Sequence, residues 1–183
     1  MNASQALAEG IDLCKPLMVR YLAGFADSTR AAQAPGLPNH VAWSLGHCAL
    51  TMHRVAERVE AVAAGRTPTD SPGPLCAQDF TPGPRGDSER FGAESIAFGS
   101  TPAPDAANFP TMARCVAAYD AACDRLAAAL RSLDPDRLDA TIPYGSNTLT
   151  VRAVALRMVF HNGDHCGQIA DLRRALGMKS IFA

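Results

Sequence analysis

The chain has 183 residues, of which 48% are hydrophobic, and its formal net charge is -1 at pH 7. Its 17 Lys and Arg residues are scattered rather than gathered into the basic patch typical of nucleic-acid binding. No uncharged apolar run of 18 or more residues is present to cross a membrane. We therefore expect neither a nucleic acid nor a membrane as partner. The length suits one domain with a substantial core, covering residues 1–183.

The N-terminal residues and the cysteines indicate where the protein resides. The first residues lack the basic and apolar regions of a signal peptide. Six cysteines are present without a Cys-x-x-Cys pair, which argues against a zinc ribbon or a thioredoxin-type site. Cys14 and Cys123 fall at apolar positions typical of a core, and no disulfide framework is expected without export. These features predict a cytoplasmic protein.

Four segments repeat apolar residues at alternating intervals of three and four, the pattern of helices packed in a bundle. The predicted helices cover residues 4–26, 39–64, 110–133 and 150–176. Pro16 lies inside the first helix and should kink it, because proline removes one backbone donor. Thr150 is the expected N-cap of the fourth helix. We predict an all-α four-helix bundle with no sheet larger than a short ribbon.

The connection between the second and third predicted helices is long and rich in proline and glycine. It spans residues 66–109, which is too long for an ordinary connection. This segment is either partly ordered over the domain, as a lid would be, or a floppy surface crossover. A short helical turn is expected around residues 87–91. Farther along, Tyr144-Gly145-Ser146-Asn147 is a turn signal that short extended pieces should flank.

The stretch FHNGDHCGQIADL, from Phe160 to Leu172, contains two histidines four residues apart. His161 and His165 therefore lie about one turn apart on the same helical face. They continue the apolar seam of the fourth helix, where polar side chains are costly unless satisfied. A bound zinc, nickel or ferrous ion would satisfy both imidazoles. The alternative is that two ordinary surface or core histidines happen to have this spacing.

A metal ion on these two histidines needs a further ligand from a facing helix. His47 lies in the most apolar turn of the second predicted helix. The apolar stripe of that helix is centred near Cys48, about 100° away from His47, so Cys48 competes as the ligand. Helical geometry leaves both alternatives open. His40 lies at the entrance of the same helix and His53 beyond its midpoint.

The sequence lacks the signatures of several other catalytic and metal sites. The Glu-x-x-His pairs of di-iron bundles, the His-Glu-x-x-His of zincins, GxSxG and the Walker loop do not occur. Cys166 is a candidate reactive thiol, although helical spacing turns it about 100° from His165. Asp164 either orients a ligand from behind or is a solvated surface charge.

Two segments resemble the DinB-like (damage-inducible) family of metal-binding four-helix bundles. They are WSLGH, which ends at His47, and TLTVRAVALRMVFHNGDHCGQIADLRRALG in the fourth helix. The resemblance covers most of the chain and implies an up-down-down-up bundle with a three-histidine site open to water. The implied ligands are His47, His161 and His165. The implied ion is divalent, zinc or nickel first, with iron or manganese as alternatives.

The resemblance also implies a class of activity. It indicates a metal-dependent enzyme, either a thiol-dependent transferase or isomerase or a hydrolase, acting on a small molecule or a low-molecular-weight thiol. An open metal position would activate water or a thiol. The alternative is a non-catalytic bundle with a structural or vestigial metal, which the missing obvious general base favours. Continuous apolar seams on the first and third helices further predict a homodimer.

Overall fold

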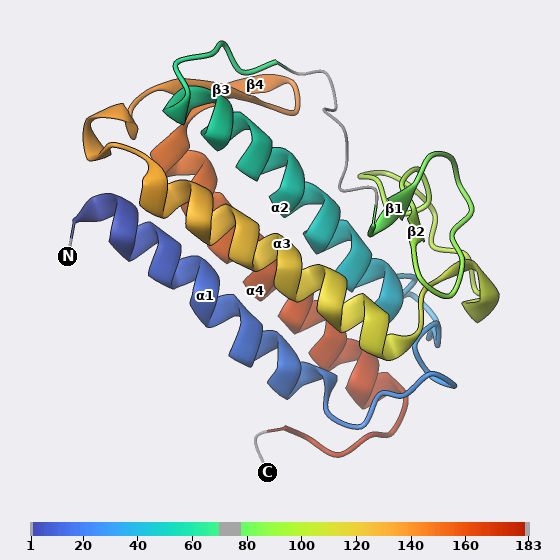
Figure 1. Ribbon diagram of the computed structural model, residues 1–183. Helices are drawn as coiled ribbons and strands as arrows, with labels where there is room; N and C mark the ends of the chain where they lie inside the picture. Colours follow the sequence, from blue (N-terminus) through green and yellow to red (C-terminus); the bar gives the residue numbers. More distant parts are fainter. Residues whose placement is uncertain (1, 70–77, 182–183) are drawn as a thin grey trace.

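The computed structural model describes residues 2–69 and 78–181 (Figure 1). It is mostly helical, as predicted, and every predicted long helix is present. The four long helices are α1 (Ala3–Leu22), α2 (Val41–Ala63), α3 (Met112–Ser132) and α4 (Val151–Ala175). Helix α1 continues through Pro16 but ends before residue 26. It stops because Ala23 leaves the helical conformation, with a ψ of 124°, and Gly24 has a φ of 87°, a left-handed conformation that glycine adopts without strain.

The helices lie side by side, and each packs on two others (Figure 1). Helices α1 and α2 both contact α3 and α4. A polar network inside the core fixes the rotation of α4. The Tyr119 hydroxyl donates to Asn162 Oδ1 at 2.8 Å, and Asn162 Nδ2 donates to the Met158 carbonyl at 2.8 Å. Because Asn162 is held in the core, the neighbouring face of α4, with His161 and His165, is turned toward α2.

The first half of α2 is buried on all sides, as its apolar composition predicts. Every residue from Val41 to Leu50 is buried. Besides α3 and α4, residues 78–109 lie over this half, and we call them the covering segment. There the Phe91 ring packs over Gly46, and a Cβ on that glycine would lie only 2.7 Å from the ring. Glycine at position 46 therefore allows the covering segment to approach the helix backbone.

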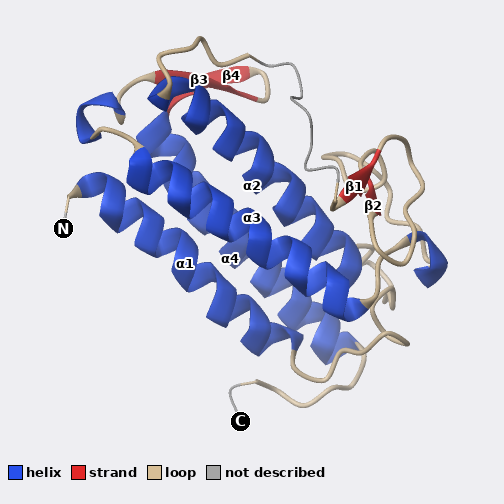
Figure 2. Ribbon diagram, in the orientation of Figure 1, coloured by secondary structure: helices blue, strands red, loops and turns tan. Residues whose placement is uncertain are grey.

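The strands are short, which confirms that no sheet exceeds a ribbon among the described residues (Figure 2). Strand β1 (Phe80–Thr81) pairs in parallel with β2 (Phe91–Gly92). Strands β3 (Thr141–Tyr144) and β4 (Asn147–Thr150) are the short extended pieces expected beside the turn. They pair as an antiparallel hairpin, and its turn contains Gly145 at a φ of 60°.

The helical turn predicted around residues 87–91 is wrong. Asp87 Oδ1 instead accepts hydrogen bonds from the backbone N–H groups of Glu89, at 2.8 Å, and Arg90, at 2.7 Å. These bonds cap a bend, and Phe91 is drawn into β2. Short 3₁₀ turns occur at Ala106–Asn108 and at Pro135–Arg137 instead.

Residues 78–109 are ordered over α2, which favours a segment partly ordered over the domain rather than a floppy surface crossover. Residues 70–77 lie outside the described part. The Trp43 indole N–H donates to the Ser95 carbonyl at 2.9 Å and to Ser100 Oγ at 3.0 Å. His40 Nε2 donates to the Ala103 carbonyl at 3.0 Å. The covering segment is thus held to α2 at several points.

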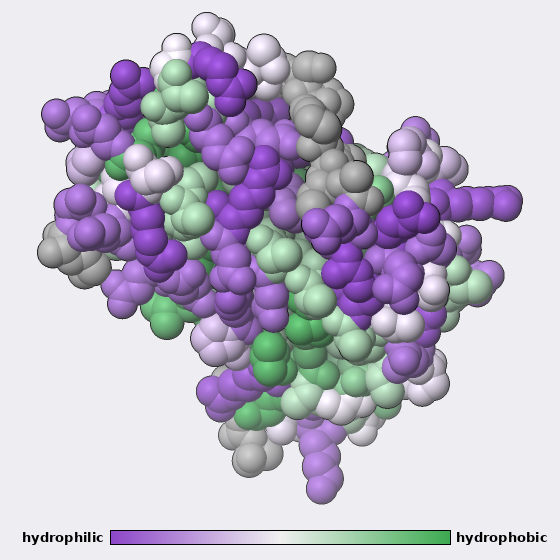
Figure 3. Space-filling view, viewed as in Figure 1, coloured by the Kyte–Doolittle hydropathy of each residue, from purple (hydrophilic) through white to green (hydrophobic). Residues whose placement is uncertain are grey.

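Hydrophilic side chains cover most of the face shown in Figure 3, with a band of hydrophobic residues among them. Within the described residues, no helix has both the length and the apolar character that crossing a membrane requires.

Candidate metal centre

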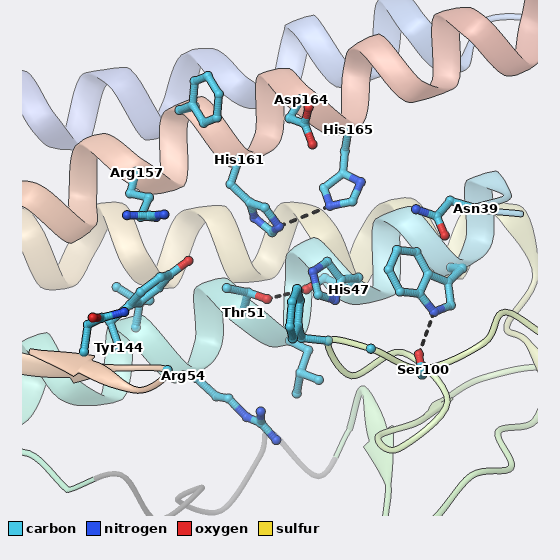
Figure 4. Close-up of a pocket in the computed structure, with 18 of the residues that line it drawn as sticks. Asn39, His47, Thr51, Arg54, Ser100, Tyr144, Arg157, His161, Asp164 and His165 are labelled. Atoms are coloured by element: carbon cyan, nitrogen blue, oxygen red, sulfur yellow. Dashed lines mark hydrogen bonds between the residues drawn. The ribbon is translucent and has the colours of Figure 1, made fainter. Parts of the chain in front are cut away.

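Three histidines meet between α2 and α4 (Figure 4). Helix α2 supplies His47, and α4 supplies His161 and His165. One ring nitrogen from each lies within 4.8 Å of the other two. The Nε2 atoms of His161 and His165 are 3.1 Å apart. Two nitrogens at about 2.0–2.1 Å from one ion would lie about 3.0–3.4 Å apart, so this spacing fits shared ligation.

The orientation of His47 is fixed from both sides. Its Nδ1 lies 2.8 Å from the Ile96 carbonyl oxygen. Because a carbonyl only accepts, Nδ1 carries the proton, and Nε2 presents its lone pair. The Trp43 ring stacks on the imidazole with centroids 4.7 Å apart and planes within 6°. His47 is therefore held in the tautomer and orientation that a metal ligand needs.

His165 has a similar support made from side chains. Its Nδ1 lies 3.1 Å from Gln168 Oε1, which leaves Nε2 facing His161. Gln168 is itself held from two directions: Asn39 Nδ2 donates to its Oε1 at 3.0 Å, and its Nε2 donates to Asp164 Oδ2 at 2.9 Å. Asp164 therefore contacts Gln168, which contacts His165 in turn, and this arrangement favours the orienting role of Asp164 over that of a solvated surface charge.

Burial keeps the three imidazoles neutral. Desolvation, followed by the neighbouring imidazoles, lowers the pKa of His161 to about 3 and that of His165 to about 4. Burial also lowers the pKa of His47. Neutral imidazole is the form that binds metal ions. Among the described residues, His161 Nδ1 is buried without a hydrogen-bond partner.

The two cysteines considered from the sequence do not join the cluster. Cys48 is fully buried in the core, and this burial raises the pKa of its thiol well above the ordinary value. Cys166 Sγ packs 4.0 Å from Met18 Sδ, and burial raises its pKa to about 12. Both thiols are protonated packing groups at physiological pH.

The remaining two histidines have other surroundings. His40 is the N-cap of α2, where its Nδ1 accepts from the Trp43 backbone N–H at 3.1 Å. Burial lowers its pKa to about 4. His53 lies under the covering segment, with Nε2 3.7 Å from Asp79 Oδ2. Neither histidine lies in the cluster.

The cluster opens into a pocket of about 1210 Å³. Its walls are α2, α4, residues 98–100 and the β3–β4 turn. Small-molecule sites usually measure about 300–1,000 Å³, so the pocket has room for a ligand beside the histidines. Tyr144 and Arg157 lie next to each other on one side of His161 (Figure 4), with the Arg157 guanidinium 5.5 Å from the centre of the Tyr144 ring.

A family model described as the DinB superfamily matches residues 12–169. The chain belongs to the DinB superfamily. A crystal structure described as that of a conserved protein from Enterococcus faecalis resembles this DinB chain with a TM-score of 0.65. The identity is 17%, and the match covers 97% of this chain and 99% of the other, so it shows the fold alone. A search of curated proteins finds no match.

Several site groups of this DinB chain were not predicted from its sequence. The Ile96 carbonyl is a main-chain group, and no residue type signals its position. The sequence indicates Tyr144 only as part of a turn. The spacing of Arg54 and Arg58, four apart on the helix that carries His47, was a readable signal of a charged pocket wall.

Proposed function

We propose that this DinB-superfamily protein holds one divalent metal ion on His47, His161 and His165 and is a metal-dependent enzyme. The observation that carries the proposal is the convergence of three neutral imidazoles at a pocket. Two of them are oriented from behind by Ile96 and Gln168. Three imidazoles suit zinc or nickel best, with iron or manganese as alternatives.

The count of three protein ligands supports a catalytic site. Structural zinc sites are normally closed by four protein ligands, whereas catalytic sites keep a position for water or substrate. When bound, the ion would act as a Lewis acid that lowers the pKa of a water or thiol. Around it, Trp43 shields one side of His47, and the pocket admits a small molecule. We propose a thiol-dependent transferase or isomerase, or a hydrolase, as the class.

A non-catalytic bundle with a structural or vestigial metal is the alternative. One observation favours it: among the described residues that line the pocket, the single carboxylate is Asp164, which is engaged with Gln168. The described residues that line the pocket therefore include no free carboxylate that could act as a general base. Metal analysis of protein purified without added ions tests the metal site. Turnover with a panel of low-molecular-weight thiols and electrophiles then distinguishes the two functions.

We also propose the wider arrangement of the molecule. The course of the helices in Figure 1 supports an up-down-down-up order with a crossover between α2 and α3. One continuous hydrophobic core supports a single domain over residues 1–183. The free thiols of the described cysteines support a cytoplasmic location. Exposed Leu13 and Leu17 on α1 support a homodimer.

A further inference from the structure

One end of the pocket is lined by arginines. Arg54 and Arg58 lie one turn apart on the face of α2 that carries His47, and Arg157 lies across the pocket on α4. At 1.5 Å per residue, Arg54 is about 10 Å along the helix from His47, and Arg157 is about 6 Å from His161. The backbone positions of Arg54 and Arg157 are therefore about 6–10 Å along their helices from the histidines, on one side only, and Arg58 is one turn farther away.

Among the described residues, neither Arg54 nor Arg157 forms an ion pair with a carboxylate, although the charge of Glu57 acts on Arg54. Asp164 hydrogen-bonds to Gln168, on the side of His165 away from the arginines. Glu57, although it lies on α2 between Arg54 and Arg58, is directed toward Arg125 of α3, with 3.7 Å between Oε1 and Nη1.

The side chain of Arg54 has a buried donor that is not satisfied. Its Nε is buried and has no hydrogen-bond partner among the described residues. Burial, followed by the charge of Arg58, lowers the pKa of Arg54, against a smaller opposing effect of Glu57. Like charges four residues apart on a helix also repel. An anion bound beside Arg54 would offset both effects.

Arg157 is positioned by the β3–β4 hairpin. Its guanidinium lies over the ring of Tyr144, 5.5 Å from the centroid, in cation–π geometry. Figure 4 shows both side chains beside His161 at the pocket wall. Burial raises the pKa of the Tyr144 hydroxyl, which is therefore a neutral donor at physiological pH. A guanidinium held by an aromatic ring and flanked by a hydroxyl donor suits a carboxylate.

We propose that this arginine end binds a carboxylate of the substrate or thiol whose reactive atom lies at the histidines. The inference rests on the proposed metal-dependent function and narrows its ligand to an extended, anionic molecule. The carboxylate is held by Arg157 beside the Tyr144 hydroxyl, and Arg54 adds positive charge at the same end of the pocket. The spacing of these arginines from the histidines sets the length of the molecule.

The test compares two thiols with the same six-carbon chain, 6-mercaptohexanoate and 6-mercaptohexan-1-ol, on the full-length cobalt-loaded protein. Thiolate binding is titrated through the sulfur-to-cobalt charge-transfer absorption. We expect the carboxylate thiol to bind about 10-fold more tightly, because its anion forms charge-assisted hydrogen bonds. This advantage should shrink as salt is added. Arg157→Gln and Arg54→Gln should each bring the ratio of the two affinities toward one.

The matched control is Arg174→Gln. Arg174 is also an exposed arginine of α4, but it pairs with Asp171 and does not line the pocket. This variant removes the same charge and should keep the preference for the carboxylate thiol. Equal binding of both thiols by the unsubstituted protein, or a preference that survives Arg54→Gln and Arg157→Gln, would overturn the carboxylate site while leaving the metal proposal intact.

A second arm separates the two proposals if cobalt is not retained or neither thiol produces the absorption band. Binding of hexanoate and 1-hexanol to the metal-free protein is then followed by ligand-observed NMR. Binding of hexanoate that is weakened at least several-fold by Arg157→Gln, but not by Arg174→Gln, supports the carboxylate site. Hexanoate binding that is undetectable or indifferent to Arg157→Gln rejects it. Failure of cobalt retention rejects the metal proposal alone.

Discussion

His47 Nδ1 lies 2.8 Å from the carbonyl oxygen of Ile96, which is 49 residues farther along the chain. The segment before α3 therefore determines which nitrogen of a candidate metal ligand faces the pocket. Supporting hydrogen bonds of this kind typically change metal affinity about 10- to 100-fold. The order of the covering segment and the metal affinity of the histidines should rise and fall together.

Gly46→Ala tests this coupling. The added methyl would lie 2.7 Å from the buried Phe91 ring and 3.1 Å from Ile96 Cγ2, so both residues must shift. We expect the free energy of unfolding to fall by about 1–3 kcal/mol and the metal affinity to fall about 10-fold. Denaturant unfolding and metal titration by calorimetry measure the two effects.

The matched control for that change is Gly163→Ala, another glycine-to-alanine substitution within a helix. A Cβ at position 163 meets no atom within 4 Å. Alanine should therefore raise the free energy of unfolding by about 0.5–1 kcal/mol, because it restricts the unfolded chain and favours helix. If Gly46→Ala matches this control in stability and in metal affinity, the covering segment does not govern the site.

Substitutions of the three histidines test the ligand set. His161→Ala and His165→Ala should each abolish retention of metal through gel filtration, because one imidazole on α4 makes a weak site. His47→Ala should do the same. Cys48→Ala should leave the metal content unchanged, since its thiol is fully buried in the core. Full metal content in His47→Ala together with loss in Cys48→Ala would show that Cys48 is the third ligand.

Gln168→Leu tests the support of His165. This change removes the oxygen 3.1 Å from His165 Nδ1 and frees Asn39 and Asp164 from their partner. We expect a loss of metal affinity of about 10-fold or more with the helix content preserved. Competition with a chelating dye gives the affinity, and circular dichroism gives the helix content. Unchanged affinity would mean that Gln168 does not orient the histidine.

The metal-free protein should lose stability as the pH falls below about 6.5. The pKa values of His40, His161 and His165 in the fold are about 4, 3 and 4, because burial lowers each from the ordinary histidine value of 6.5. Below pH 6.5 the unfolded chain therefore binds protons that the folded chain does not bind, which favours unfolding down to about pH 4. Denaturant unfolding in the presence of a chelator measures this slope.

One histidine can be removed from that pH dependence without removing a proposed ligand. His40→Asn keeps an effective N-cap for α2 and eliminates one titrating group. The dependence of unfolding free energy on pH should then become shallower by about one proton between pH 6.5 and 4. An unaltered slope would show that His40 titrates normally in the folded protein.

The predicted homodimer is tested by light scattering at micromolar concentration. The seam residues that motivated the prediction, such as Ile11 and Met18, are buried inside the bundle. The exposed apolar residues of α1 are instead Leu13, Leu17 and Val19, with exposures of 62%, 42% and 52%. If α1 forms the interface, Leu13→Glu combined with Leu17→Glu should yield a monomer. A monomeric unsubstituted protein would contradict the prediction.

The sequence predicted the long helices well because their apolar repeats coincide with burial. The helix ends were predicted less well. Helix α1 stops before Gly24, although its apolar repeat continues to Phe25. Phe25 packs beside Arg173 beyond the end of the helix. His161 and His165 were readable because helical spacing is local. His47 and Cys48 stayed undecided, because the rotation of α2 depends on the segment that covers it.

Trp43 is the only tryptophan of the chain, and its ring stacks on His47 and lies 6.0 Å from that of His165. The protein therefore contains a built-in optical reporter in van der Waals contact with one proposed ligand. Indole emission should respond to the charge and rigidity of the adjacent imidazole. Metal uptake, chelation and ligand entry can accordingly be followed in real time on the unlabelled protein, with no competing tryptophan signal to subtract.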